Sequence, residues 1–247
     1  MYRGRFSRTL ALASLLVVAA CARSAGGPEP VATPRAATVW TGDDPRAPMG
    51  PPRPDATLLE VEWAKQLRPL RVDTANTGAK IDVQLYAKDG SVDPTAVDAF
   101  SNAVADANGS FPLSERLVQL AIKAAHHFGA RELEVVSAYR KPRRKDSGDH
   151  HSKGEALDFR LPGVDYRQLA VYLRSLPRVG VGVYTDRRTR YVHLDVRDRS
   201  FHWLDASPPG VTWREAALPD AKQAVRDASY DVESDLPLDP AVPRGRR

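Results

Sequence analysis

The sequence predicts an α+β fold in which a small antiparallel sheet carries helices on its flanks. Segments with the composition of strands and segments with the spacing of amphipathic helices follow one another without regular alternation. Two short apolar runs late in the chain are separated by a tight polar turn, which indicates a hairpin. Hydrophobic residues make up 42% of the chain and charged residues 27%, as in globular proteins.

The first half of the chain holds three expected elements. Residues 80–87 (KIDVQLYA) have the residue types of a strand and end at a turn. Residues 94–106 predict a helix with Pro94 at its first position. Residues 114–128 predict a longer helix, because apolar side chains recur at helical spacing and Gly129 follows them as a terminator.

The second half of the chain is expected to hold most of the sheet. The expected elements are strands at 132–138 and 156–161, a short helix at 165–176, a hairpin of strands at 179–184 and 190–197, and a last helix at 214–229. The segment after residue 235 is rich in proline and is expected to lack regular structure.

The N-terminal segment has the features of a bacterial export signal. Arg3, Arg5 and Arg8 give it a positive start, and residues 10–20 form an apolar stretch of secretory length that is too short to span a membrane comfortably. The stretch ends in Val18-Ala-Ala-Cys21, which resembles the lipobox of bacterial lipoproteins. The resemblance implies lipidation of Cys21 and a stable membrane anchor of several acyl chains. An ordinary cleaved signal peptide is the alternative, and either form predicts export.

The residues after the signal predict a lipoprotein that works away from its membrane. Ala22 stands where Asp would favour retention at the inner membrane of Gram-negative bacteria, so we expect the periplasmic face of the outer membrane. Residues 22–58 are rich in Pro, Gly and Ala and predict an extended tether. The expected organisation is therefore a signal peptide at 1–21, the tether at 22–58, a globular domain at 59–205 and a C-terminal extension at 206–247.

Charge and cysteine content exclude several classes of protein. The 36 Lys and Arg residues exceed the 31 Asp and Glu residues by only five, and three of the cations lie in the signal segment. The remaining excess of positive charge is too small to indicate that the protein binds nucleic acid. Cys21 is the only cysteine, which excludes an internal disulfide and a zinc site built from several thiolates.

Two polar clusters interrupt the predicted sheet. Alternate residues of a strand share a face, so in residues 191–197 (YVHLDVR) His193 and Asp195 share one with Tyr191 and Arg197. The intervening apolar residues point into the core. A titratable face of this kind is either exposed to solvent or lines a site.

The other cluster lies between residues 150 and 158. Asp158 occupies one face of the predicted strand 156–161, and Gly154 precedes that strand, so His151 lies on a loop that can fold back over it. Two histidines and a carboxylate on neighbouring strands suit a catalytic zinc with three protein ligands and a fourth position for water. Each histidine alone is more often a surface or core residue, so spacing leaves both interpretations open.

Several motifs resemble one known group of enzymes. His151-Ser-Lys-Gly-Glu-Ala-Leu-Asp158 resembles the H-x-x-G-x-A-x-D motif of the D-Ala-D-Ala metallopeptidase group within the LAS zinc peptidases. Residues 180–184 (GVGVY) and 191–197 are similar to that group's G-V-G-x-Y and F-V-H-x-D stretches, and residues 136–142 (VSAYRKP) to its S-x-Y-R-x-P turn. The resemblance is strongest to the murein endopeptidase K branch, which also has an aromatic region such as Phe201-His-Trp203.

This resemblance implies a fold and a set of functional residues. It implies the LAS or hedgehog-type zinc peptidase fold for residues 59–205, with His151, Asp158 and His193 as ligands of Zn²⁺. It places Arg140 near the substrate or the oxyanion, where a guanidinium stabilises developing negative charge. A structural ion pair is the alternative for this arginine.

The role of Asp195 stays open between two possibilities. It lies two residues beyond His193 on the same strand face and acts either as a general base or as a group that orients the site. Other branches of the group place a Glu three residues, or a His two residues, before the last ligand as the base. Arg190 and Tyr191 stand there in this chain, and Asp149 replaces the group's Ser before the first ligand.

The remaining histidines and a basic stretch receive secondary assignments. His150 is one residue too far from the carboxylate for the motif, so we expect it at the loop surface or in contact with substrate. His126 and His127 end a helix and are expected to be structural, whereas His202 is expected at the rim of the cleft. Residues 143–145 (RRK) flank the site as a solvated loop or as an attraction for substrate carboxylates.

Together the resemblances imply an exported, lipid-anchored zinc peptidase that hydrolyses peptide bonds in the stems or crosslinks of peptidoglycan, with endopeptidase action favoured. One alternative is a D,D-carboxypeptidase that removes the terminal D-Ala on the same fold. Another is a catalytically inactive lipoprotein that binds the cell wall, which the missing Glu or His base leaves open.

Overall fold

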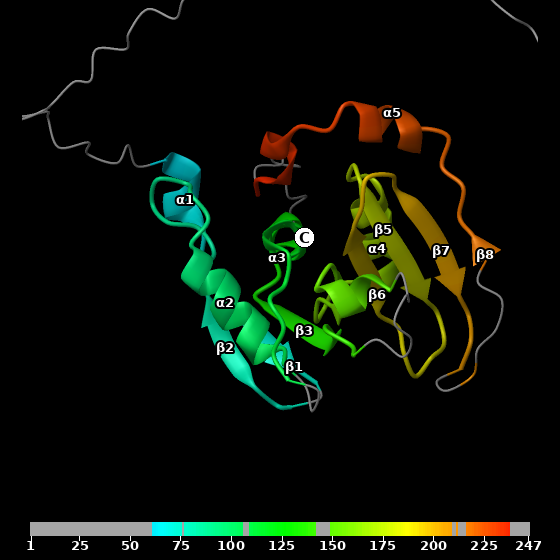
Figure 1. Ribbon diagram of the computed structural model, residues 1–247, viewed down its shortest axis with the longest axis horizontal. Helices are drawn as coiled ribbons and strands as arrows, with labels where there is room; N and C mark the ends of the chain where they lie inside the picture. The colour runs from blue at the N-terminus through cyan, green and yellow to red at the C-terminus, as the bar shows by residue number, and fades with distance from the viewer. Residues whose placement is uncertain are drawn as a thin grey trace, which may run out of the picture. The chain divides into compact units, whose positions relative to one another are not determined.

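The computed structural model describes residues 61–75, 77–105, 109–141, 149–208, 211 and 216–237. The signal segment with Cys21, the tether and the basic stretch 143–145 lie outside these residues, so their predictions stay predictions. Within the described residues the fold is mixed α+β, with one sheet and several helices (Figure 1).

The sheet has eight strands in the order β2-β1-β3-β4-β6-β5-β7-β8. Their bounds are β1 Leu70–Thr74, β2 Lys80–Val83, β3 Glu132–Ser137, β4 Ala156–Arg160, β5 Val179–Tyr184, β6 Val192–Val196, β7 Phe201–Asp205 and β8 Ala216–Ala217. The pairs β1–β3 and β5–β7 are parallel, and the other neighbours are antiparallel.

The expectation of a small antiparallel sheet is therefore wrong in size and in strand direction. The helices between β1 and β3 form a crossover connection, which lets those two strands run parallel. After the expected hairpin of β5 and β6, the chain returns to the outer side of β5 and adds β7 there. Strands β1 and β7 were not among the expected elements.

Helices and short 3-10 turns complete the fold. Their bounds are α1 Glu62–Gln66, α2 Pro94–Ala103, α3 Glu115–Phe128, η1 His150–Lys153, α4 Tyr166–Arg174, α5 Gln223–Ala228 and η2 Val232–Asp235. Asp93 caps α2 by accepting a hydrogen bond from the Thr95 amide, and Pro94 follows as expected. Gly129 ends α3 in the left-handed conformation, also as expected. The described helices are all too short or too polar to cross a bilayer.

Three predicted elements are shorter than expected. Strand β2 ends at Val83, and Tyr86 makes only an isolated bridge with Val92. Helix α2 ends at Ala103. The predicted helix 214–229 is wrong over its first part, because Ala216–Ala217 form strand β8 at the sheet edge and α5 covers only Gln223–Ala228. Residues 106–108 and 212–215 lie outside the described part of the chain.

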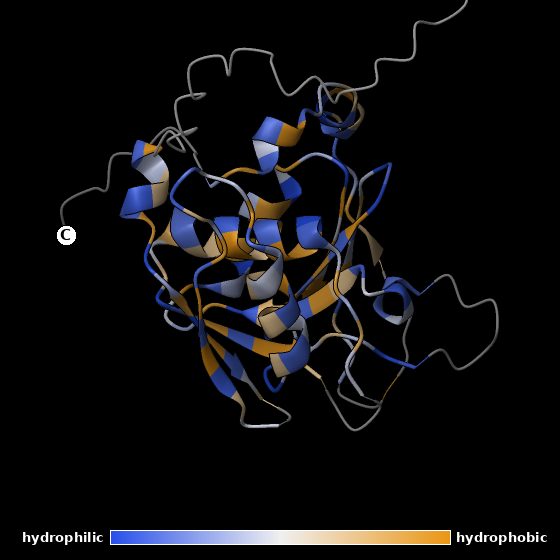
Figure 2. Cartoon of the chain, turned by 60° about the vertical axis from the view of Figure 1, so that its left-hand side comes forward, coloured by the Kyte–Doolittle hydropathy of each residue, from blue (hydrophilic) through white to orange (hydrophobic). Residues whose placement is uncertain are grey.

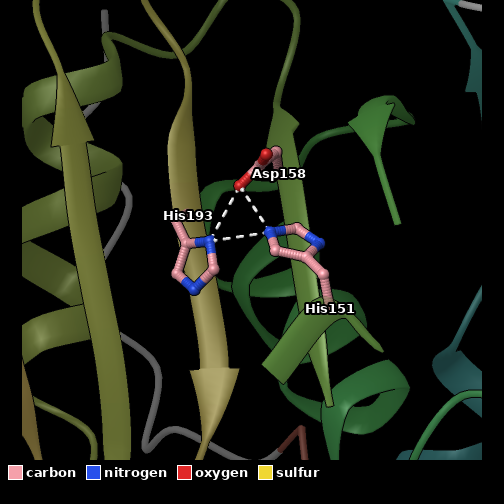
Figure 3. Close-up of side chains that lie close together, drawn as sticks. All are labelled: His151, Asp158 and His193. Atoms are coloured by element: carbon pink, nitrogen blue, oxygen red, sulfur yellow. Dashed lines mark hydrogen bonds and ion pairs between the residues drawn. The ribbon is translucent and has the colours of Figure 1, made fainter. Parts of the chain in front are cut away.

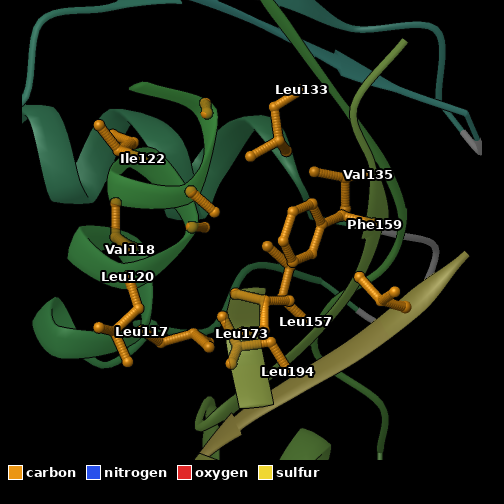
Figure 4. Packing of buried hydrophobic residues seen from close by; sticks show 14 of the residues in the cluster. Leu117, Val118, Leu120, Ile122, Leu133, Val135, Leu157, Phe159, Leu173 and Leu194 are labelled. Carbon is orange, nitrogen blue, oxygen red and sulfur yellow. The ribbon is translucent and has the colours of Figure 1, made fainter. Parts of the chain in front are cut away.

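The core lies between the helices and one face of the sheet, and it decides which strand residues remain for the site. Leu117, Val118, Leu120 and Ile122 of α3 are buried in the same cluster as Leu133, Val135, Leu157, Phe159 and Leu194 of the strands (Figure 4). Each such side chain stabilises the fold by roughly 1.5–3 kcal/mol. Figure 2 shows hydrophobic residues gathered on the central helices and strands, with hydrophilic ones frequent in the outer turns.

Candidate metal centre and active-site cleft

The three residues that the motif singles out come together from two strands and one 3-10 turn. Asp158 of β4 pairs in register with His193 of β6, so both side chains lie on the face opposite Leu157 and Leu194. His151 reaches them from η1, which folds back over β4 as the sequence predicts (Figure 3).

Local capping fixes the position of η1. The Asp149 carboxylate accepts a hydrogen bond from the His151 amide (3.1 Å) at the start of the turn. Gly154 ends the turn with φ of 71°, and a Cβ atom there would overlap the carbonyl oxygen of Pro112. The H-x-x-G spacing therefore reflects a turn that only glycine fits.

The polar atoms of the three residues converge within a few ångströms. His151 Nε2 lies 3.1 Å from His193 Nδ1 and 3.4 Å from Asp158 Oδ1, and His193 Nδ1 lies 2.8 Å from the same oxygen (Figure 3). The exposed fractions are only 2%, 3% and 6% for His151, Asp158 and His193. The cluster is thus a buried set of two nitrogens and one oxygen.

Each of these residues uses its second polar atom outside the cluster. His151 Nδ1 donates a hydrogen bond to the Ala138 carbonyl, and His193 Nε2 donates to Asp195 Oδ2 (3.0 Å). Asp158 Oδ2 accepts from the Arg140 guanidinium (3.0 Å). These outer bonds fix both imidazole tautomers so that their lone pairs point into the cluster.

The arrangement fits a zinc ion. Two ring nitrogens and a carboxylate oxygen that face one another in a buried cluster need a shared cation between them, and either a proton or a metal ion can fill that role. Tetrahedral zinc with bonds of about 2.0–2.1 Å spaces its ligand atoms about 3.3 Å apart. Two of the separations observed here, 3.1 and 3.4 Å, are close to that value, and the third, between His193 Nδ1 and Asp158 Oδ1, is shorter at 2.8 Å. Two imidazoles and one carboxylate are also a known donor set of catalytic zinc sites.

The pKa shifts of the cluster have a matching cause. Burial alone would lower the pKa of His193, but its bonds with Asp158 and Asp195 raise that pKa to about 9. Burial would raise the pKa of Asp158, yet its bonds with His151 and His193 hold that pKa well below its usual range. The buried carboxylates therefore favour a cation at the centre of the cluster.

Asp195 lies behind His193 and is fully buried. Its two oxygens accept hydrogen bonds from Arg197, and one of them also accepts from His193 Nε2. Gly180 of β5 stands opposite, and a Cβ atom there would overlap both the Asp195 carboxylate and the Arg197 guanidinium. The first glycine of the G-V-G motif thus makes room for this ion pair.

A cleft of about 480 Å³ opens over the cluster. Its lining residues are Arg140, Asp149, His150, His151, Tyr184, His193, Asp195, Arg197, Phe201 and Trp203. The Trp203 ring lies 5.0 Å from the His193 ring between centroids, and Gly182 leaves the space that Trp203 occupies. The aromatic region expected from the sequence is therefore one wall of the cleft.

The structure places the remaining predicted residues as follows. Arg140 forms an ion pair with Asp158, which is the structural role considered above as the alternative. Its side chain is also 46% exposed and lines the cleft. His150 is outside the metal cluster, lines the cleft and donates from Nδ1 to Glu155 (2.9 Å). Tyr191 is half-buried and stacks on Tyr184.

The expectation that His202 lies at the cleft rim is wrong. On β7, His202 and Trp203 point to opposite faces, so when Trp203 enters the cleft His202 points away from it. His202 is 2% exposed, and neither of its ring nitrogens has a hydrogen-bond partner among the described residues.

Some contributors to the site carry no simple sequence signal. The Ala138 carbonyl that holds His151 is a backbone group, and only its position inside the S-x-Y-R motif, two residues before Arg140, could suggest it. Arg197 lies just after β6 on the side of its polar face, as the sequence predicts. Its hydrogen bonds to Asp195 need the space left by Gly180 on the neighbouring strand, which no local pattern reveals.

Comparison with known proteins identifies the family. A family model described as the peptidoglycan L,D-endopeptidase MepK (Peptidase M15_2) matches residues 62–203, more than half of the chain. The match includes every residue that lines the cleft. No curated protein and no solved structure matches the chain. The resemblance seen in the motifs is therefore confirmed, and the chain belongs to the Peptidase M15_2 (MepK) family of metallopeptidases.

Proposed function

We propose that this protein is a zinc-dependent endopeptidase that hydrolyses peptide crosslinks of peptidoglycan. The observation that carries the proposal is the buried cluster of His151, Asp158 and His193, in which every outer polar atom already has a partner. Hydrogen bonds from the outer atoms of ligand side chains to neighbouring groups are what holds metal ligands in place. Membership in the MepK family supports peptidoglycan as the substrate.

The chain's own residues divide the chemistry between them. Bound zinc supplies Lewis-acid chemistry, since it polarises a carbonyl and makes water nucleophilic near neutral pH. Arg140 lies at the cleft with part of its guanidinium exposed, so we assign it to the carbonyl oxygen on which negative charge develops. Trp203 and Phe201 form an apolar wall against which a peptide chain can lie.

Asp195 fits the orienting role better than the role of a general base. Both of its oxygens accept hydrogen bonds from Arg197 or His193, and the residue is fully buried. Its bonds with His193 and Arg197 also hold its pKa well below the usual range, although burial alone would raise it. We therefore propose that Asp195 fixes the His193 tautomer and does not itself take a proton from water.

The N-terminal features complete the proposal. We propose that residues 1–21 are a lipoprotein signal, that Cys21 carries the lipid, and that residues 22–58 extend the enzyme from the periplasmic face of the outer membrane. The only cysteine of the chain stands where the lipobox needs it, which supports this assignment. An extended tether suits a substrate that is a mesh set apart from the membrane.

Digestion of crosslinked peptidoglycan tests the proposed reaction. The protein starting at residue 22 is incubated with purified sacculi with zinc, with a chelator, and as His193→Ala, and products are identified by mass spectrometry. His127→Ala is the matched control, because His127 lies outside the cleft. We expect loss of dimeric muropeptides that chelation and His193→Ala both abolish. Loss of terminal D-Ala alone would establish the carboxypeptidase, and bound zinc without any product would establish the wall-binding alternative.

A further inference from the structure

A second groove adjoins the active-site cleft, and the C-terminal extension helps to build it. This groove has a volume of about 540 Å³ and shares His150 and Arg197 with the cleft. Lys153 of η1 and Arg178, just before β5, line it from the family-matched part of the chain, and Tyr230 lines it from the segment after α5. The two hollows therefore meet along shared side chains.

The C-terminal segment is fastened to the domain beside this groove. Asp235 is buried and accepts hydrogen bonds from Arg116 Nε (2.8 Å) and from the Tyr230 hydroxyl (2.7 Å). Asp227 of α5 accepts from the amide and the hydroxyl of Ser200 (2.7 and 2.6 Å). Residues beyond the family match thus form part of the same folded unit.

Arg178 has an unusual backbone that these contacts maintain. Its φ is 53°, in the left-handed region that residues other than glycine rarely adopt. Its amide donates to Asp227 Oδ1 (2.6 Å), and its carbonyl accepts from Arg116 (2.9 Å) and from the Arg197 amide (3.1 Å). A strained residue held by several partners is a reasonable candidate for a functional position.

The guanidinium of Arg178 is fixed at one edge and available at the other. Its Nε donates to the Asp227 carbonyl (3.3 Å), and its Cζ lies 4.6 Å from the centroid of the Tyr230 ring. Among the described residues, no acceptor pairs with its two terminal nitrogens, and the side chain lines the groove. A planar guanidinium held in this way is ready to bind a carboxylate through two parallel hydrogen bonds.

The other charges leave a carboxylate as the ligand that this groove favours. Arg116 and Arg197 are already neutralised by buried Asp235 and Asp195. Lys153 is exposed and has no acceptor in the described part of the chain, so it adds a second available cation. Two acidic residues also line the groove: Glu155 accepts a hydrogen bond from His150, and the charge of Asp198 is exposed to solvent, which screens its repulsion of a bound carboxylate.

From this geometry we infer that the groove is a substrate subsite in which Arg178, assisted by Lys153, binds a free carboxylate of the peptidoglycan stem peptide. The inference rests on the proposed function and deepens it. The scissile bond lies over the His151 cluster, while a neighbouring part of the crosslinked peptide extends past His150 and Arg197 into the groove. Peptide stems carry free carboxylates, so they provide the chemistry that the groove recognises.

Arg178→Gly is the most informative variant. Glycine keeps the positive φ and the amide bond to Asp227 and removes only the side chain. Arg178→Lys keeps the charge without the planar fork. Arg167→Ala, an exposed arginine of α4 outside both hollows, is the matched control. Urea unfolding of the full chain in detergent verifies that each variant is folded.

Kinetics are measured on crosslinked muropeptides whose carboxylates are free or amidated. For Arg178→Gly we expect KM to rise about tenfold with free carboxylates, with kcat and zinc content close to wild type. Amidation should raise KM for the wild type and have little further effect on the variant. Arg178→Lys should be intermediate. An unchanged KM in Arg178→Gly, or an equal effect of amidation on both proteins, would overturn the inference.

A binding measurement separates this inference from the proposed function. Calorimetry of an uncrosslinked stem peptide with the full chain requires no turnover. If Arg178→Gly binds the stem peptide more weakly than the wild type, but the wild type does not hydrolyse crosslinked muropeptides, the endopeptidase is refuted and the subsite is retained. Hydrolysis by the wild type with equal binding by both proteins would retain the enzyme and refute the subsite.

Discussion

One added methyl group on β5 should disconnect Asp195 from His193. In Gly180→Ala the new Cβ atom would overlap Asp195 Oδ2 and Cγ at separations that real Cβ atoms do not adopt. The Arg197 end can shift because its side chain is long, but the Asp195 side chain is short and cannot keep its buried position beside the new methyl group. The carboxylate must therefore turn toward the cleft that it lines, away from the His193 Nε2 that it holds at 3.0 Å.

The size of the effect follows from two contributions. Overpacking of a buried position costs about 1–3 kcal/mol of unfolding free energy. Loss of the partner that orients a ligating histidine lowers metal affinity or activity by about 10- to 100-fold. We therefore expect Gly180→Ala to remain folded, to lose zinc to a competing chelator at a lower chelator concentration, and to hydrolyse crosslinked muropeptides correspondingly more slowly.

A double-variant cycle tests whether the effect passes through Asp195. Asp195→Ala removes the side chain that the methyl group displaces, so Gly180→Ala should change zinc affinity little further in that background. The assay is chelator competition on wild type, both single variants and the double variant. Fully additive losses of zinc affinity would refute the reasoning, because they would place the effect of the methyl group elsewhere.

Three further predictions concern a ligand, a buried histidine and the N-terminus. His193→Ala should lower bound zinc, measured by elemental analysis, at least about tenfold; full retention of zinc would contradict the ligand assignment. Burial lowers the pKa of His202 to about 4, below the value of about 6.5 in an unfolded chain, so the unfolded state binds more protons and stability is lost as pH falls from about 6.5 toward 4. At pH 5 this loss of unfolding free energy is about 2 kcal/mol. Urea unfolding at pH 7.5 and pH 5 should show the loss in the wild type and not in His202→Phe. If the variant shows the same pH dependence as the wild type, other groups cause the loss. Cys21→Ser should move the protein from the membrane fraction to the soluble fraction, and continued membrane attachment would exclude the lipid anchor.

The local pattern predicted the faces of the central strands correctly. The alternation in β6 placed His193 and Asp195 opposite Leu194, and the structure shows that division, with Leu194 in the core. The same holds for Asp158 and Phe159 on β4. These predictions succeed because the side-chain period of a strand is a local property. The motifs also identified the family correctly, whereas the ligand and catalytic roles stay predictions.

The sheet as a whole could not be predicted in the same way. Pairing of β1 with β3 and of β5 with β7 skips the strand that comes between them in the chain, and no local pattern encodes such neighbours. The sequence of β7 suggests only an aromatic motif at the cleft, Phe201-His-Trp203, whereas these residues form a strand whose two faces differ in burial and contacts. Contacts such as Arg116 with Asp235 span more than a hundred residues and leave no periodic signal.

The fastening of the C-terminal segment has a consequence for the order in which the molecule assembles. Asp227 and Asp235 follow every strand of the central sheet in the chain, so they are the last of these residues to become available for folding. Until then Arg178 lacks the acceptor for its amide, and Arg116 lacks its carboxylate. The groove beside the cleft therefore takes shape only after residues 227–235 have joined the folded domain. A protein cut back to the family-matched residues would carry the His151 cluster but would lose these bonds.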